Sequence, residues 1–193
     1  MKKLSTYLFL ILFSFQVSSW ADDIRDFQIE GMSIGDSLLD YVSEEKITKE
    51  KDYYPKSKKF AAFGKEIPSF KTYESFRVHF KDDDKKYIIK AIDGMIRYEN
   101  NIEDCYKKMH EIAEELSSLF KDAKKSENKN VSHSYDESGE SKTTDVRFML
   151  QSDDGVKVSC VDWSKKMESE FFDVLKVEMA TKEIINWFLN EAY

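Results

Sequence analysis

The chain has 193 residues, of which 41% are hydrophobic and 14% aromatic, and its formal net charge is −7. This apolar content is enough for a hydrophobic core and excludes a chain that is disordered throughout. The length predicts one domain. No apolar run beyond the N-terminus reaches the roughly 20 residues that a membrane-spanning helix needs, so we expect no transmembrane segment in the mature chain.

The N-terminus has the layout of a secretory signal peptide. A basic pair at residues 2–3 precedes an apolar stretch at residues 4–17, and small residues then occupy the −3 and −1 positions before Asp22. We therefore predict that residues 1–21 are a signal peptide, cleaved between Ala21 and Asp22, and that the protein is periplasmic or secreted. An uncleaved membrane anchor is the alternative, although the apolar stretch is short for a span.

Cleavage would make the protein more acidic. It removes two lysines and no acidic residue, which leaves 28 basic and 37 acidic side chains and a charge of −9. Phosphate backbones and anionic lipids repel a protein of this charge. We expect no nucleic-acid partner.

Cys105 and Cys160 are the only two cysteines. In an exported protein such a pair predicts a disulfide. It would close a loop of about 55 residues, which stabilises the fold by roughly 3–4 kcal/mol on the chain-entropy model. Neither cysteine lies in a C-x-x-C motif, so a thioredoxin-like redox pair has no support.

The first elements expected along the mature chain are short. Ser33 is placed to cap a helix with an apolar face, and residues 43–51 predict a second, exposed helix. Residues 60–63 predict a short strand. The apolar face of the first helix would consist of Ile34, Leu38, Leu39 and Val42.

Period-two alternation then predicts a hairpin. Residues 75–80 form its first strand, residues 82–84 its turn and residues 87–92 its second strand, and Asp93-Gly94 predicts a bulge or bend before residues 95–98. The first strand has an apolar face and a polar face, with Phe76, Val78 and Phe80 on one and Ser75, Arg77 and His79 on the other.

The strongest helical pattern begins after Asn101, an expected N-cap, with Asp104 completing a variant of the capping box. An apolar stripe then runs for about five turns and buries Cys105 in its first turn. The stripe consists of Ile102, Cys105, Tyr106, Met109, Ile112, Ala113, Leu116 and Phe120.

Residues 124–144 are almost free of apolar side chains, and we predict a polar mobile loop there. A second hairpin follows, with apolar alternation at residues 146–150 and 156–160 and a turn at Asp153-Asp154-Gly155. The last elements are a strand with Leu175, Val177 and Met179 on one face and a helix capped by Thr181, which Ile184, Ile185, Trp187 and Phe188 would anchor to the sheet.

Together these elements predict a single α+β domain over residues 22–193. We expect an antiparallel sheet of about five hairpin-connected strands, covered on one face by the long central helix and the C-terminal helix. The disulfide between Cys105 and Cys160 would tie the central helix to the sheet.

The sharpest catalytic motif is Gly31-Met32-Ser33-Ile34-Gly35, which matches the G-x-S-x-G nucleophile elbow of serine hydrolases. Ser33 would need a histidine base, and the candidates are His79, His110 and His133. In α/β-hydrolases the elbow follows several strands, whereas only about nine mature residues precede Gly31 here. We therefore favour a helix cap and keep a serine hydrolase as the alternative.

The remaining motifs are incomplete. His110-Glu111 with Glu114 lacks the second histidine of H-E-x-x-H, and the acidic turns at residues 82–84 and 153–155 lack the spacing of an EF-hand loop. We predict no catalytic, cofactor-binding or metal-ligating residues and no cofactor.

Aromatic residues offer a possible binding surface. The spacing of Trp187 indicates a core position, and Trp163 lies near the second cysteine. The sequence leaves open whether Tyr53 and Tyr54 form a binding surface.

Four segments, residues 26–39, 104–108, 160–164 and 181–193, resemble small uncharacterised exported proteins of free-living marine alphaproteobacteria. The resemblance implies a bacterial protein of the periplasm or the medium, and it implies no activity and no site residues.

These observations favour a non-enzymatic binding or envelope-associated domain. Its partner would be another envelope protein or a small ligand. Two alternatives remain: a serine hydrolase that uses Ser33, and a purely structural envelope protein.

Overall fold

The structure is a computed structural model that describes residues 23–66, 71–99 and 101–193. The predicted signal peptide and its cleavage site between Ala21 and Asp22 lie outside these residues. In chain order the elements are η1 (Ile24–Asp26), η2 (Leu38–Asp40), α1 (Glu44–Glu50), β1 (Asp52–Tyr53), β2 (Phe60–Glu66), β3 (Ser75–Lys81), β4 (Ile89–Arg97), α2 (Ile102–Leu119), β5 (Lys124–Ser132), β6 (Lys142–Met149), β7 (Gly155–Asp162), β8 (Val174–Ala180) and α3 (Lys182–Asn190).

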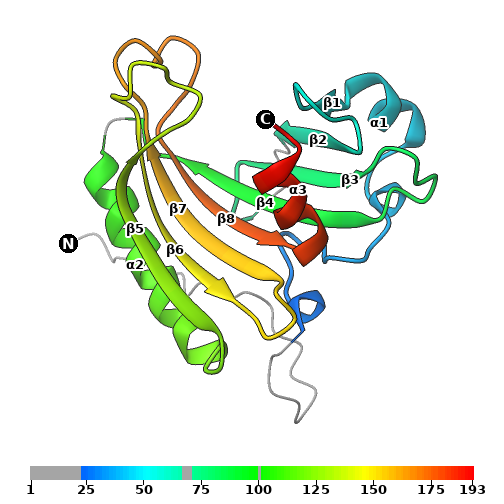
Figure 1. The fold of residues 1–193 in the computed structure, drawn as a ribbon, viewed down its shortest axis with the longest axis horizontal. Helices are drawn as coiled ribbons and strands as arrows, with labels where there is room; N and C mark the ends of the chain where they lie inside the picture. Colours follow the sequence, from blue (N-terminus) through cyan, green and yellow to red (C-terminus); the bar gives the residue numbers. More distant parts are fainter. Residues whose placement is uncertain (1–22, 67–70, 100) are drawn as a thin grey trace.

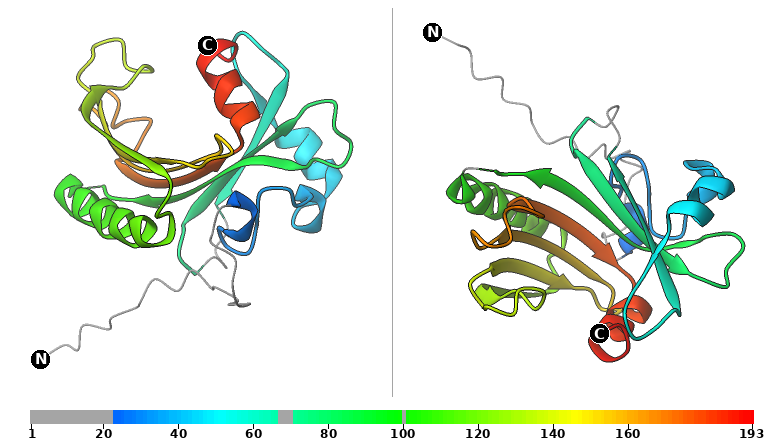
Figure 2. Two further views of the ribbon diagram at one scale, coloured as in Figure 1. Left: turned by 60° about the horizontal axis from the view of Figure 1, so that its bottom comes forward. Right: turned by 90° about the horizontal axis from the view of Figure 1, so that it is seen from above.

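The strands form one antiparallel sheet of eight strands in the order β1-β2-β3-β4-β8-β7-β6-β5. The last strand, β8, lies between β4 and β7 and so joins the two hairpin-connected halves. The sheet is curved like a trough, with α2 and the N-terminal segment outside it and α3 inside (Figures 1 and 2). The α+β class and the antiparallel pairing are confirmed, and the expected number of strands was too low.

The convex face of the sheet holds the main core. Because successive side chains of a strand point to opposite faces, the apolar positions of β3, β7 and β8 all lie on this side. The buried stripe of α2 packs against those of β7 and β8. Asn101 caps this helix as expected, since its side chain accepts a hydrogen bond from the backbone N–H of Asp104 at 3.2 Å. The other half of the convex face is covered by the N-terminal segment, with Ile24, Phe27, Ile29, Met32 and Leu38 buried.

A disulfide joins Cys105 in the first turn of α2 to Cys160 on β7, with their Cα atoms 6.1 Å apart. The predicted cross-link is therefore confirmed, and it fastens the helix to the centre of the convex face. No helix among the described residues is long and apolar enough to span a membrane.

The C-terminal helix α3 lies on the opposite face from α2, which corrects the prediction that both helices cover one face (Figure 2). Its buried Ile184 and Trp187 pack against Phe60, Ala91 and Ala180. Ala91 pairs with Ala180, and Ala180 pairs with Gly155, so three adjacent strands present a row of small residues. A Cβ atom at Gly155 would lie 3.1 Å from the Ile185 side chain. Small residues let the helix approach the sheet.

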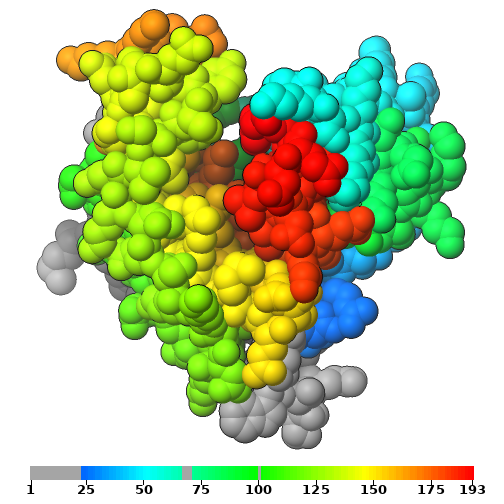
Figure 3. Space-filling model, viewed as in Figure 1, coloured from blue at the N-terminus to red at the C-terminus, as the bar shows by residue number. Residues whose placement is uncertain are grey.

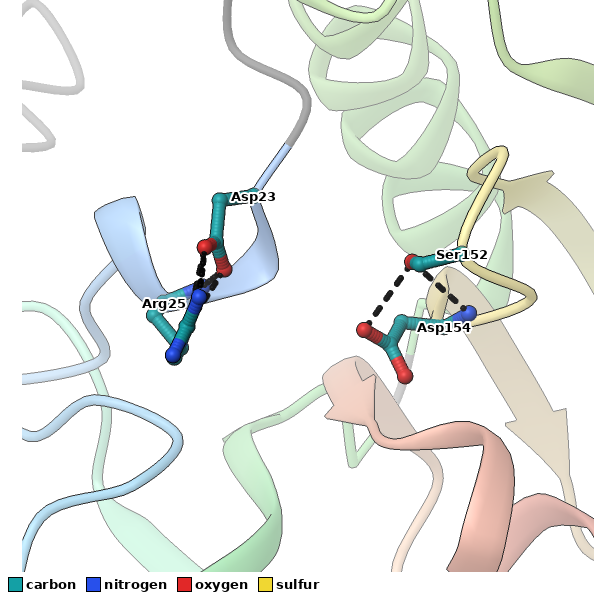
Figure 4. Close-up of polar contacts among 4 residues, drawn as sticks. All are labelled: Asp23, Arg25, Ser152 and Asp154. Atoms are coloured by element: carbon teal, nitrogen blue, oxygen red, sulfur yellow. Dashed lines mark hydrogen bonds and ion pairs between the residues drawn. The ribbon is translucent and has the colours of Figure 1, made fainter.

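The β6–β7 turn caps α3. Thr181 stands at the N-cap but makes no side-chain capping bond. Instead, the Lys182 backbone N–H donates to Asp154 Oδ1 at 2.7 Å. Figure 4 shows the bond that orients this carboxylate, in which Ser152 Oγ donates to Asp154 Oδ2 at 3.0 Å. A carboxylate at a helix N-terminus satisfies an unpaired N–H group and interacts favourably with the helix dipole. The acidic turn therefore has a structural use.

The loop predicted at residues 124–144 is not present as such, because Lys124–Ser132 form β5 and Lys142–Met149 form β6. Strand β5 is the exposed edge of the sheet and pairs only with β6, so it has no apolar face that a sequence pattern could indicate. The connecting turn is held by Asp136, which accepts hydrogen bonds from Ser138, Ser141 and Ser164. The prediction of about five strands also omitted β1, which has two residues.

Two smaller predictions were also wrong. The short helix expected after Ser33 is absent, and the 3-10 helix η2 follows Ser37, whose Oγ accepts from the Leu39 N–H at 3.2 Å. Strand β4 continues through Asp93-Gly94 without a bulge. Gly94 serves packing instead, because a Cβ atom there would lie 2.6 Å from the Tyr73 ring.

Replacing both Cys105 and Cys160 with alanine is expected to lower the free energy of unfolding by about 3–4 kcal/mol, since the loop between the two positions is no longer restrained in the unfolded chain. Urea unfolding of the oxidised wild type and the double variant measures the difference. Unfolding free energies that agree within error would contradict this expectation.

Candidate functional site

The concave face of the sheet carries a row of charged side chains. Arg147 on β6, Lys157 on β7, Glu178 on β8, Asp93 on β4 and Arg77 on β3 are direct register partners from strand to strand. Neighbouring strands lie about 4.8 Å apart, so this charged row crosses five strands without interruption. It runs beside the small residues that support α3.

The next row on the same face is more mixed. Asp145, Ser159, Lys176 and Met95 are partners on β6, β7, β8 and β4. Lys176 therefore lies one position along from the charged row, close to its centre.

The space-filling view shows this face hollowed between the β5–β6 hairpin on one side and α3 on the other, with atoms of β8 at its floor (Figure 3). We call this region the hollow. His133 follows β5 and Tyr193 follows α3, the two elements beside the hollow. Burial lowers the pKa of His133, and the charges of Lys176 and Lys157 lower it further. Burial raises the pKa of Tyr193, while Arg77 and Lys157 act against that rise. The cations of the hollow therefore act to lower the pKa values of residues on both sides of it.

Two of its charged pairs are complete. Lys157 Nζ lies 2.5 Å from Glu178 Oε2, and Arg147 Nε lies 2.6 Å from Asp145 Oδ1. Burial alone would lower the pKa of Lys157, but the charge and hydrogen bond of Glu178 outweigh burial and raise it. Lys157 is therefore a fixed positive charge at neutral pH.

Asp93 is the exception among the carboxylates. Its side chain is 9% exposed and accepts no hydrogen bond from the residues that the structure describes. Burial, followed by the negative charge of Glu178 on the neighbouring strand, raises the pKa of Asp93 to about 7, although Lys176, Lys157 and Arg77 oppose the shift. A buried carboxyl without a donor is costly, and Asp93 is the carboxylate of the charged row that has no hydrogen-bond or ion-pair partner among the described residues.

Lys176 is its cationic counterpart. Within the described ranges it takes part in no ion pair or side-chain hydrogen bond, and it is half-buried. Since Asp93 pairs with Glu178 and Lys176 with Met95, the two residues are diagonal neighbours across β4 and β8. Diagonal positions of this kind have Cα atoms about 7–8 Å apart. The hollow thus contains one unpartnered acid close to one unpartnered base.

His79 lies at the end of the concave face that α3 covers. It is 2% exposed, and its Nε2 is 2.9 Å from the Tyr54 hydroxyl. Burial, with the charges of Arg77 and Lys176, lowers its pKa to about 3, so the ring is neutral in the folded protein. Its Nδ1 and the Nε of Arg77 are buried without a hydrogen-bond partner among the described residues.

The serine-hydrolase motif is not assembled. Ser33 is 7% exposed, belongs to the segment on the convex side, and donates its Oγ hydrogen to the Phe27 carbonyl at 3.0 Å. His79 lies on the opposite face of the sheet, His110 is exposed on α2, and the His133 ring contacts Trp163 with 4.5 Å between centroids. Ser33 therefore has no base, and its hydroxyl stabilises the N-terminal turn.

The two adjacent tyrosines separate in space. The Tyr53 hydroxyl donates to Asp82 Oδ1 at 2.7 Å on the outer side of the sheet. The Tyr54 ring contacts Trp187, Phe188 and Tyr193, so only Tyr54 borders the hollow. Trp187 is fully buried, as expected.

Two depressions lie elsewhere on the surface. One is lined by Tyr41, Lys46 and Lys65 beside α1, and the other by Lys59, Lys81 and Asp82. Lys65 and Lys81 have carboxylate partners, in the Lys65–Glu50 and Lys81–Glu183 pairs, whereas Lys46 lies beside Lys65, which lowers the pKa of Lys46. No group of three or more His, Cys, Asp or Glu side chains in the described part of the chain is arranged to hold a metal.

A scan against protein-family models and searches of curated proteins and solved structures found no match to this chain. The site therefore has to be argued from its own geometry. Sequence reasoning missed Asp93 because an Asp-Gly pair indicates a turn, and it missed Lys176 and Glu178 because alternating charges indicate a solvent-exposed strand face.

Asp93 and His79 are expected to have opposite effects on stability between about pH 4.5 and 6.5. The unfolded state binds the extra proton at His79, whose pKa falls to about 3 on folding, so this group makes stability fall as pH falls. The folded state binds the extra proton at Asp93, whose pKa rises to about 7, so this group makes stability rise as pH falls. In the wild type the two effects oppose each other.

The Asp93→Asn substitution removes the effect of Asp93 on the pH dependence of stability. Relative to wild type, this variant is expected to lose about 1.4 kcal/mol of unfolding free energy for each pH unit of acidification in that window, and His79→Gln is expected to change in the opposite direction. Urea unfolding at constant ionic strength measures both, with Asp83→Asn in the exposed β3–β4 turn as the control. Parallel pH curves for Asp93→Asn and wild type would disprove the assignment.

A fluorophosphonate probe is expected to leave the folded protein unlabelled, because Ser33 is buried and lacks a base. Intact mass spectrometry before and after incubation measures labelling. A labelled wild type and an unlabelled Ser33→Ala variant would restore the serine-hydrolase hypothesis.

Proposed function

We propose that this protein is an exported, non-enzymatic binding domain that holds a small charged ligand in the hollow of its curved sheet. The observation that carries the proposal is the diagonal placement on β4 and β8 of two groups of opposite charge, Asp93 and Lys176, on a face that α3 covers only in part. Neither group has a hydrogen-bond or ion-pair partner among the described residues.

The energetic argument rests on what unpaired charges cost. Desolvating an ionisable group without a partner destabilises a fold, and such exceptions concentrate at functional sites. The same face shows that this chain does pair its other charges, as in Lys157–Glu178 and Arg147–Asp145. A ligand with charges complementary to Asp93 and Lys176 would give both side chains a partner of opposite charge.

The shape of the face favours a small ligand over a protein partner. A stable protein interface buries about 800 Å² on each partner. The charged floor of the hollow is confined between α3 and the β5–β6 hairpin (Figure 3), which suits a smaller ligand. Export is supported by the disulfide between Cys105 and Cys160, which is typical of oxidising compartments, and by the predicted signal peptide.

Thermal unfolding of the mature, oxidised chain tests the proposal. The probes are a dicarboxylate (succinate), a diamine (putrescine), a zwitterion (glutamate) and a neutral sugar (glucose). At least one charged probe is expected to raise Tm, because a ligand at 100 times its Kd adds about 2.7 kcal/mol of stability, equivalent to several degrees for a domain of this size.

The rise is expected to disappear in Asp93→Asn with Lys176→Gln and to persist in the exposed-site control, Asp83→Asn with Lys85→Gln. If no charged probe raises Tm, and native mass spectrometry of protein purified from its own envelope shows no small molecule retained, the proposal fails.

A further inference from the structure

The geometry points to a zwitterionic amino acid as the ligand of the hollow, with its ammonium group on the carboxylate of Asp93 and its carboxylate group on the ammonium of Lys176. This inference rests on the proposed function and specifies its ligand class.

The acidic end of the hollow suits an ammonium group. Asp93 and Glu178 are direct partners on β4 and β8, so their carboxyl groups lie on the same face, and the charge of Glu178 acts on Asp93. Glu178 Oε2 already has Lys157 Nζ at 2.5 Å and the Ser159 hydroxyl at 3.5 Å, whereas Asp93 has no donor among the described residues. An ammonium brings three N–H donors and a positive charge, and it would relieve the repulsion between the two carboxylates.

The basic end suits a carboxylate group. Lys176 carries three N–H donors and forms no ion pair with the described residues, and Arg77 at the end of the charged row reaches its nearest acid, Asp52, only at 3.9 Å. Both cations act on the same region, since each lowers the pKa of His79 and opposes the raised pKa of Asp93. A ligand carboxylate at Lys176 would therefore meet an ammonium group that no ion pair with the described residues neutralises.

The arrangement also discriminates against other charged ligands. A dicarboxylate would place its second carboxylate against Asp93 and Glu178, and a diamine would place its second ammonium against Lys176. Like charges in a partly desolvated site repel strongly. Only a ligand with both signs of charge satisfies both ends.

Binding should be linked to pH. The groups that face Asp93 are Glu178 and Lys176 from β8, Lys157 from β7 and Arg77 from β3, with Tyr54 and Tyr193 at the border near α3. Because an ammonium binds the ionised carboxylate, it displaces the proton that Asp93 holds at and below neutral pH. Affinity is therefore expected to be about tenfold weaker at pH 6 than at pH 8.

Isothermal titration calorimetry on the mature, oxidised chain tests the inference, with the standard free α-amino acids as probes and succinate and putrescine as comparisons. For the amino acid that binds best, the analogue without the amino group and the amide without the carboxylate are each expected to bind at least tenfold more weakly. Titrations in buffers of different ionisation enthalpy are expected to show proton release near pH 7.

Two variants separate the ends of the site. Asp93→Asn is expected to weaken amino-acid binding at least tenfold and to abolish its pH dependence. Lys176→Gln is expected to weaken binding of the amino acid while leaving the already weak amide unchanged. Asp83→Asn and Lys85→Gln are the matched controls. Should either site variant fail to fold, the two analogues and the pH dependence of the wild type still decide.

The outcomes distinguish this inference from the proposed function. Binding of succinate or putrescine without binding of any amino acid overturns the inference and leaves the binding function intact. Amino-acid binding that is unaffected by Asp93→Asn and by pH also overturns it. Absence of binding by every probe overturns the inference. If native mass spectrometry of the protein from its own envelope also shows no small molecule retained, it overturns the proposed function as well.

Discussion

Strands β4, β7 and β8 form the middle of the sheet, and each carries mostly apolar side chains on one face and mostly charged or small side chains on the other. That alternation decides how the rest of the chain is arranged. The apolar side requires a cover, which α2 and the N-terminal segment provide, and the disulfide between Cys105 and Cys160 fixes the helix there. The charged side is left for α3 alone, and α3 covers only part of it. The hollow follows from this unequal division of covering elements.

The curvature of the sheet gives the hollow its electrostatic character. Side chains on a concave face converge, so each charge loses water and approaches its neighbours more closely than on a flat sheet. Lys157 and Glu178 form an ion pair, and the pKa of Asp93 is raised to about 7. His79, which is buried beside α3, has its pKa lowered by burial and is neutral. The same surroundings thus give three different results, according to whether each group has a partner of opposite charge.

Much of the fold could be predicted because its signals are local. The alternation of Phe76, Val78 and Phe80, the stripe of α2 and the cysteine pair all belong to single segments or to one pairing. Strand β5 could not be predicted, because an edge strand exposed along almost its whole length has no apolar pattern and is held by backbone pairing. The charged residues of the hollow could not be predicted from the sequence either. Asp93 and Glu178 are far apart in sequence, and only the insertion of β8 beside β4 makes them neighbours.

The position of the hollow is set by residue size as much as by charge. Along β4, β8 and β7, the small residues Ala91, Ala180 and Gly155 form one row, and Asp93, Glu178 and Lys157 form the next row on the same face. The helix can lie on the first row because nothing there keeps it away from the backbone. It could not extend over the second row without burying charged side chains under an apolar helix face, which is strongly unfavourable. The boundary between these two rows therefore marks both the edge of the second core and the edge of the hollow, and a change of two residues along each strand separates a packing surface from a charged surface.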